Sequence, residues 1–261
     1  MRILLTNDDG IQSDGFQFAY KALSAAGHSV VACAPDRERS AQSQSISLYS
    51  CLQAKEVDMP DGAIGFAVNG TPADCTRLGC HLMKDQPADL VVSGINTDCN
   101  LGYDANYSGT VGAALEGLAA GYPALAVSLE RSANYDWLQA ADIAVKAASL
   151  FFTWNLPIGA MVNLNIPAVI SNPEWIWTSL NHIPAKETYV QEKDDEGRLV
   201  YRRTRLTEFS EAVPGSDVAL FQAGRITLSP VGPVRTDWRT LTRLTGLVPA
   251  DPDSPSAQTS L

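Results

Sequence analysis

Short apolar runs alternate with amphipathic segments along most of the chain, and the two patterns predict strands and helices in turn. The run at residues 3–5 has no polar interruption and stops before a turn at Gly10, which is typical of a strand buried on both faces. Further strands are predicted in shorter pieces within 48–68 and at 28–34, 89–93, 123–129, 161–166 and 225–229. Helical spacing of apolar residues predicts helices at 14–26, 71–83, 108–121, 137–152 and 216–223. A strand, a helix and a second strand within the first 34 residues indicate a parallel sheet with right-handed crossovers.

The pattern changes at about residues 175–209, where β-rich pieces surround the charged turn EKDDEGR. This predicts a projecting antiparallel hairpin arm with Gly197 in its turn. An arm of this kind has little core of its own, so we expect a partner subunit to cover it. The stretch 246–261 is rich in Pro, Asp and Ser and is typical of a disordered tail. The sequence therefore predicts a single α/β domain over residues 1–245 that includes the arm.

Composition narrows the class of protein. A chain of 261 residues with 45% hydrophobic and 18% charged residues suits a globular protein with a sizeable core. The net charge of -10 argues against binding a nucleic acid polymer, because phosphate neutralisation needs clustered Lys and Arg. No run reaches the ~18 apolar residues of a membrane span, and the first apolar run is too short for a signal peptide. We therefore expect a cytoplasmic protein, in which the five cysteines are reduced thiols.

Candidate chemistry begins where the first strand ends, at Asp8 and Asp9. Ligands gather at the carboxyl ends of parallel strands, where the serine-rich loop around Ser40 and the long loop 94–110 are also expected. Two neighbouring carboxylates repel unless a cation shares them, and oxygen donors from Asp, Ser and Asn suit Mg²⁺ or Mn²⁺ better than Zn²⁺. A polar turn in which Gly10 supplies the bend stays open as the alternative.

The helix predicted from Ser108 begins with Ser-Gly-Thr. Its free backbone N–H groups and the hydroxyls of Ser108 and Thr110 form a favourable phosphate site. A serine helix cap with nothing bound is the alternative. Motifs of other chemistries are absent from the sequence, including G-x-S-x-G, G-x-G-x-x-G and the Walker loop, and the three histidines lie outside the polar segments.

Six segments together resemble the SurE survival-protein nucleotidases. They are NDDG, PDRERSAQSQS, VNGTPADC, DLVVSGIN, YSGTVGAALEG and GSDVALFQAGRITLSP, and they follow in order from residue 1 to about residue 230. The resemblance implies a three-layer α/β/α Rossmann-like core with a mostly parallel sheet. It implies a homodimer or homotetramer with C-terminal elements swapped between subunits. It also implies a divalent-metal-dependent phosphatase that hydrolyses nucleoside monophosphates, that is, a 5′/3′-nucleotidase.

Carried over by motif, the resemblance assigns one Mg²⁺ or Mn²⁺ ion per subunit to Asp8, Asp9, Ser40 and Asn96. Asp8, Asp9 and Asn96 would be the catalytic residues. The residues assigned to the substrate and its phosphate are Asn7, Asn100, Ser108, Gly109 and Thr110.

This chain departs from the family pattern at four positions. Thr97, Asp98 and Cys99 stand where the family usually has His-Gly-Ala, and Ala41 stands where it usually has Gly. Two other functions stay open, and the altered loop at residues 97–99 favours the second of them. One is hydrolysis of another phosphomonoester or of short polyphosphate, and the other is non-catalytic binding of a nucleotide or metal by a regulatory protein.

Overall fold

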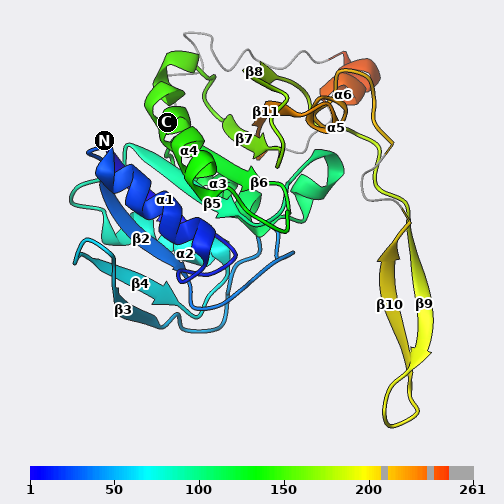
Figure 1. Ribbon diagram of the computed structural model, residues 1–261, viewed down its shortest axis with the longest axis horizontal. Helices are drawn as coiled ribbons and strands as arrows, with labels where there is room; N and C mark the ends of the chain where they lie inside the picture. The colour runs from blue at the N-terminus through cyan, green and yellow to red at the C-terminus, as the bar shows by residue number, and fades with distance from the viewer. Residues whose placement is uncertain (207–210, 234–237, 247–261) are drawn as a thin grey trace.

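The computed structural model describes residues 1–206, 211–233 and 238–246. Within them, one sheet of nine strands forms the centre of the molecule (Figure 1). Its strands are β1 (Arg2–Thr6), β2 (Ser29–Pro35), β3 (Ala54–Asp58), β4 (Ile64–Val68), β5 (Leu90–Asn96), β6 (Ala124–Leu129), β7 (Met161–Ile166), β8 (Asn172–Trp177) and β11 (Arg225–Val231). They lie in the order β3-β4-β2-β1-β5-β6-β7-β11-β8.

The sheet is mostly parallel, as predicted. Within this sheet of nine described strands, the neighbouring pairs are parallel except β3–β4 and β7–β11. Strands β5, β6 and β7 are buried along their whole length. This burial on both faces explains why they read as apolar runs in the sequence.

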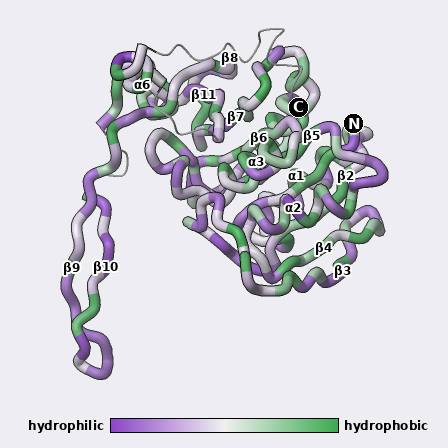
Figure 2. Tube along the Cα trace, turned by 180° about the vertical axis from the view of Figure 1, so that it is seen from behind, coloured by the Kyte–Doolittle hydropathy of each residue, from purple (hydrophilic) through white to green (hydrophobic). Residues whose placement is uncertain are grey.

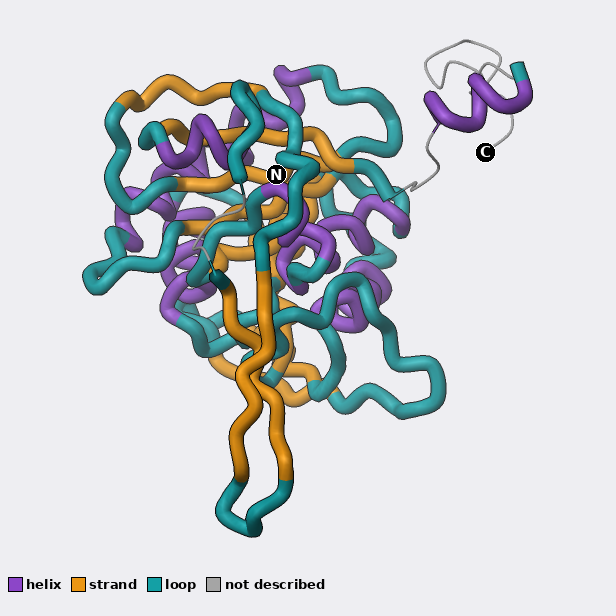
Figure 3. Tube along the Cα trace, turned by 90° about the vertical axis from the view of Figure 1, so that its right-hand side faces the viewer, coloured by secondary structure: helices purple, strands orange, loops and turns teal. Residues whose placement is uncertain are grey.

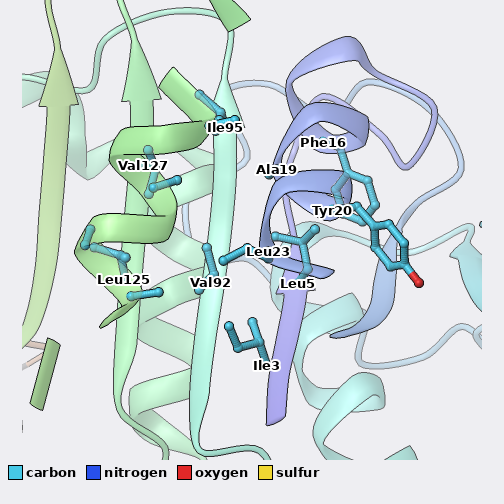
Figure 4. Close-up of a cluster of buried hydrophobic side chains, with 14 of the residues drawn as sticks. Ile3, Leu5, Phe16, Ala19, Tyr20, Leu23, Val92, Ile95, Leu125 and Val127 are labelled. Carbon is cyan, nitrogen blue, oxygen red and sulfur yellow. The ribbon is translucent and has the colours of Figure 1, made fainter. Parts of the chain in front are cut away.

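Helices cover both faces of the sheet and complete the predicted three layers. Helices α1 (Asp14–Ala25) and α4 (Trp137–Leu150) pack on one face, and α2 (Pro72–Leu82) and α3 (Gly109–Ala119) pack on the other. On the α1 side, Phe16 and Leu23 contact a core that includes Ile3 and Leu5 of β1 (Figure 4). Leu4, between them in sequence, faces the α2 and α3 core, because side chains alternate along a strand.

Helix starts follow the sequence signals. Thr71 and Asp74 form a reciprocal capping box at the start of α2, with Pro72 at its first position. Ser108 caps α3 by accepting a hydrogen bond from the Val111 N–H. Helix α3 is rich in small residues, and a side chain at Gly117 would meet Val91 of β5 at 2.9 Å. The small residues therefore let α3 pack closely on the sheet.

Several boundaries differ from those predicted. Strand β5 continues three residues beyond its predicted end, so Asn96 lies on the strand and not in the loop after it. The fourth long helix stops at Leu150 and continues as a 3₁₀ turn. The remaining short elements are η1 (Gly102–Asn106), η2 (Phe151–Trp154), α5 (Asp217–Gln222) and α6 (Trp238–Thr245). Across the described residues, no helix has the length and apolar character needed to cross a bilayer.

The hairpin arm consists of β9 (Glu187–Lys193) and β10 (Leu199–Arg205), with Gly197 in its turn as predicted. The prediction that the arm begins near residue 175 is wrong. Residues 172–177 form β8, which pairs in parallel with β11, and Trp175 is half-buried against the main core. The arm projects from the body and is largely hydrophilic (Figures 2 and 3). Residues 207–209 of the predicted arm and 247–261 of the predicted tail lie outside the described residues.

Candidate active site

The predicted metal ligands meet around one cavity of about 560 Å³ at the carboxyl edge of the sheet. Asp8 and Asp9 follow β1, Ser40 lies in the loop after β2, and Asn96 ends β5. Asn100 and Ser108 also line this cavity. The structure therefore brings together residues that are up to 100 positions apart in sequence, from Asp8 to Ser108.

Asp8 lies in the most enclosed part of this group, with 3% of its surface exposed. Its Oδ1 accepts a very short hydrogen bond from the hydroxyl of Thr110. Burial raises the pKa of Asp8 to about 7; the Thr110 hydrogen bond opposes the shift, and the charge of Asp9 adds to it. A cation beside this carboxylate would favour its charged form.

Asp9 is held by Thr97 at the end of β5. The Thr97 backbone N–H donates to Oδ2 of Asp9 at 3.0 Å, and the Thr97 hydroxyl donates to Oδ1 at 3.2 Å. Burial raises the pKa of Asp9, while the two hydrogen bonds from Thr97 lower it. Both carboxylates are therefore fixed by hydroxyl side chains from the elements that close the cavity.

Two predicted substrate residues have their side chains committed elsewhere. Asn7 is fully buried, and its amide bonds Gly10 and the Ser13 hydroxyl, so it fixes the turn that presents the two carboxylates. Thr110 is also fully buried, and its hydroxyl serves Asp8. Both side chains orient neighbouring groups of the site, and their assignment to the substrate stays a prediction.

Gly109 explains how α3 can begin against Asp8. A Cβ at this position would lie 2.7 Å from Cβ and 2.8 Å from Oδ2 of Asp8, closer than side-chain carbon atoms approach. The absence of a side chain lets the first turn of α3, with its free N–H groups, lie beside the carboxylates. Gly109 thus acts through close approach of the backbone.

Asn100 is clamped by buried polar side chains of the central strands. Its N–H donates to Oδ1 of Asn165 at 2.7 Å, and its carbonyl accepts from Nδ2 of Asn163 at 2.8 Å. Its own side-chain amide donates to the Ser128 hydroxyl at 2.7 Å. This clamp was not predicted from the sequence, although the two asparagines inside the buried run MVNLNI were a signal for it.

A known protein family matches the part of the chain that contains these site residues. The model of the family described as survival protein SurE matches residues 3–186. The chain belongs to the SurE family.

Relatives from the SurE family align with this protein over most of its length. The protein named 5′-nucleotidase SurE in Solidesulfovibrio magneticus is 43% identical over 239 residues, covering 88% of this chain and 91% of the relative. That of Myxococcus xanthus is 40% identical over 247 residues, covering 94% and 92%. The crystal structure of the SurE protein from Aquifex aeolicus is similar with a TM-score of 0.80 at 29% identity, covering 94% of this chain and 99% of that one. These matches confirm the resemblance and the α/β fold.

The departures from the SurE pattern are compatible with an intact site. Thr97 holds Asp9, and the added carboxylate of Asp98 pairs with Arg131 at 3.4 Å. Ala41 has a φ of +59°, in the left-handed region where glycine is favoured, so its replacement of glycine costs about 1 kcal/mol. Cys99 lines the cavity, and burial raises the pKa of its thiol, which keeps it protonated.

The donor set fits a hard divalent cation. No group of three or more His, Cys, Asp or Glu side chains in the described part of the chain is arranged to hold a metal ion. An ion beside Asp8 and Asp9 would therefore also use neutral oxygen donors, such as the Ser40 hydroxyl and the Asn96 carbonyl. The Asn96 amide nitrogen donates to the Asp98 carbonyl at 2.6 Å, which leaves its oxygen as the donor suited to a cation.

Other residues of the cavity wall were not assigned to the site from the sequence, although Asp104 and Tyr107 lie in the long loop that was expected near it. They come from η1 and its flanks, from the loop after β6 and from the arm, and they are Asp104, Tyr107, Glu130, Arg131, Arg203 and Arg205. Arg203 and Arg205 lie outside all six motif segments, 95 and 97 positions after Ser108, so only the folded structure places them at the site. The three histidines are not part of the lining, as predicted.

Proposed function

We propose that this SurE-family chain is a 5′-nucleotidase that hydrolyses nucleoside monophosphates to nucleoside and phosphate with one Mg²⁺ or Mn²⁺ ion per subunit. The observation that carries the proposal is the cavity of about 560 Å³ that brings together the carboxylates of Asp8 and Asp9 and the start of α3. A space of this size is in the usual range for a whole small ligand and exceeds what a bare phosphate needs. The relatives named 5′-nucleotidase SurE support the substrate class.

Each residue has a defined task in this proposal. Asp8, Asp9, Ser40 and Asn96 would hold the ion, which when bound polarises a phosphoryl oxygen and orients a water molecule. Ser108 and the first N–H groups of α3 would bind the phosphate. Thr110, Thr97, Asn7 and Asn100 hold these groups in place through the hydrogen bonds described above.

A phosphate-release assay with metal add-back tests the proposal. Chelated enzyme should be inactive on AMP, and Mg²⁺ or Mn²⁺ should restore hydrolysis of nucleoside monophosphates over glycerol phosphate and tripolyphosphate. Preference for tripolyphosphate would support the polyphosphate alternative. Tight nucleotide binding without any phosphate release would instead indicate a regulatory binding protein. The same panel, with 5′ and 3′ monophosphates, defines the positional preference.

We further propose that the protein is a homodimer or homotetramer with swapped C-terminal elements. The arm exposes apolar side chains on a two-stranded sheet, including Tyr189, Leu199 and Tyr201 at 66%, 55% and 61% exposure. Two strands alone are marginally stable and expose edges that a second copy would cover. Light scattering is expected to give at least a dimer, and a stable monomer at micromolar concentration would contradict this.

The proposed cellular setting is the cytoplasm. All five cysteines are free thiols, which suits a reducing compartment. The acidic chain is not expected to bind nucleic acid polymers.

A further inference from the structure

The arm contributes two arginines to the cavity, and both come from the same face of one strand. Arg203 and Arg205 of β10 line the cavity, whereas Arg202 does not. Side chains at i and i+2 share a face of a strand, and the residue between them points the other way. The base of the arm is therefore built so that one face looks into the candidate active site.

The Arg203 guanidinium is fixed as a flat surface. Its Nε donates to Oε2 of Glu187 at 2.6 Å, and its Cζ lies 6.0 Å from the ring centre of Tyr107. Tyr107 in turn contacts the ring of Tyr103, with 6.2 Å between centroids. We call Tyr107 and Arg203 the planar pair. Half of the Arg203 side chain and 48% of Tyr107 are exposed, so planar surface is left for a ligand.

The cations of this wall already have anionic partners. Arg205 pairs with Asp104 at 2.8 Å, Arg131 pairs with Asp98 at 3.4 Å, and Arg203 pairs with Glu187. A second phosphate of a ligand would therefore compete with three carboxylates and would gain little. The planar faces of the arginine and the aromatic ring can still bind a ligand, because both kinds of surface stack on nucleobases.

The planar pair also has the right place in the chain. Tyr107 directly precedes Ser108, the cap of the helix start to which the proposed function assigns the phosphate. Both belong to one continuous cavity with Asp8 and Asp9. A molecule with a phosphate at α3 and a planar ring system joined by a sugar would contact both parts.

We propose that the planar pair of Tyr107 and Arg203 is the surface on which the nucleobase of the substrate stacks, so that the arm determines preference for nucleotides over phosphorylated sugars. This inference rests on the proposed function, whose substrate class it explains. Arg205 would act as a positioning residue, since its ion pair with Asp104 ties the arm to η1.

The test compares two ligands that differ only in the base, AMP and ribose 5-phosphate. Stacking on an aromatic or arginine plane is worth about 1–3 kcal/mol per base, so Arg203→Ala should lower the ratio of kcat/KM values, AMP over ribose 5-phosphate, by about tenfold. The loss should fall on KM for AMP, because a contact remote from the phosphorus binds ground state and transition state alike. Tyr107→Leu should lower the same ratio.

Matched variants separate stacking from charge and from damage to the arm. Arg202→Ala removes an equivalent exposed ion pair, with Glu192, from the opposite face of β10 and should keep the wild-type ratio. Arg203→Lys keeps the charge and loses the plane, so it should behave like Arg203→Ala. Unchanged ratios in Arg203→Ala and Tyr107→Leu, or a wild-type ratio in Arg203→Lys, would overturn the proposal.

Calorimetric measurement of AMP binding tests the stacking surface separately from the nucleotidase activity. Wild-type protein that releases no phosphate from either compound would refute the nucleotidase. Weaker AMP binding by Arg203→Ala than by Arg202→Ala would still support the stacking surface. Active wild-type enzyme with equal AMP affinity in both variants would refute the stacking surface alone.

Discussion

Asp8 on one wall of the cavity is 3% exposed, whereas Arg203 on another wall has 50% of its side chain in solvent. The carboxylate wall, with Asp8, Asp9, Ser40 and Asn96, is built mainly on strand ends and supported by buried and partly buried hydrogen bonds. The arm wall consists of Arg203 and Arg205, which exposed ion pairs hold on a projecting hairpin, and of Tyr107, which directly follows η1. Catalytic groups must be held in fixed positions, whereas groups that recognise a substrate can adjust to it. The carboxylate wall suits the first task and the arm wall suits the second.

The largest effect is expected from the carboxylate wall. Asp9→Asn removes one charge from the proposed ion site at a strand end, outside the main core. Several kcal/mol of charge stabilisation would be lost, so kcat should fall about a thousandfold on AMP and on ribose 5-phosphate alike. Phosphate release at saturating Mg²⁺ and Mn²⁺ measures this, with circular dichroism to verify folding. Activity near wild type would refute the metal assignment.

A smaller loss of activity is expected from Thr110, which contacts Asp8 of the carboxylate wall. Thr110→Val removes the hydroxyl that bonds Asp8, a charge-assisted hydrogen bond worth about 1.5–3 kcal/mol, and should lower kcat/KM by about ten- to a hundredfold. Thr76→Val is the matched control, because Thr76 is equally buried but bonds backbone carbonyls of Pro72 and Ala113. Kinetics and melting curves of both variants decide the matter. Equal activity in the two would mean that Thr110 serves stability alone.

The buried charge of Asp8 predicts a pH dependence of the metal-free protein. The folded pKa is about 7 against 3.8 for the free group, so the folded state retains a proton that the unfolded chain has released. The contribution of Asp8 to stability therefore falls as pH rises from about 4 to about 7. Asp8→Asn should melt about 5 °C above wild type at pH 8 in the presence of chelator, and less so at pH 5.

Added Mg²⁺ sharpens this prediction. The ion should raise the melting temperature of wild type at pH 8 and should raise that of Asp8→Asn much less. Parallel melting curves for the two proteins across this pH range would show that Asp8 carries no such cost.

The smallest effect is expected at the arm wall. Arg205→Ala breaks an ion pair with Asp104 in which the two side chains are 43% and 33% exposed. Exposed pairs contribute about 0.2–1 kcal/mol, so KM for AMP should rise less than about fivefold, with the melting temperature nearly constant. A loss as large as that of Asp9→Asn would erase the distinction between the two walls.

The sequence predicted the parts of this site that depend on strand ends. The apolar run before Asp8, the end of β5 near Asn96 and the cap at Ser108 are local signals, and parallel topology then places them at one edge. Local signals do not report which way a hydroxyl turns, so the hydrogen bond from the Thr110 hydroxyl to Asp8 was not predicted.

The sequence also misjudged the region between β7 and the arm. Residues 172–177 are β-rich whether they pair with an arm or with β11, because strand propensity does not name the partner. For the same reason nothing in the segment RRTR indicated that alternate arginines reach the cavity. Long-range pairing decides both points, and it exists only in the folded chain.

Helix α3 sets a limit on how this enzyme can diversify. A side chain at Gly109 would strike Asp8 at 2.7 Å, one at Gly112 would strike the Ser43 carbonyl at 2.1 Å, and one at Gly117 would strike Val91 at 2.9 Å. Even the addition of one methyl group at any of these points shifts the helix against the carboxylates, the serine loop or the sheet. Under random mutation and selection, these three positions of α3 therefore tolerate no residue other than glycine. New substrate specificities can arise far more readily by substitutions along the solvent-facing arm.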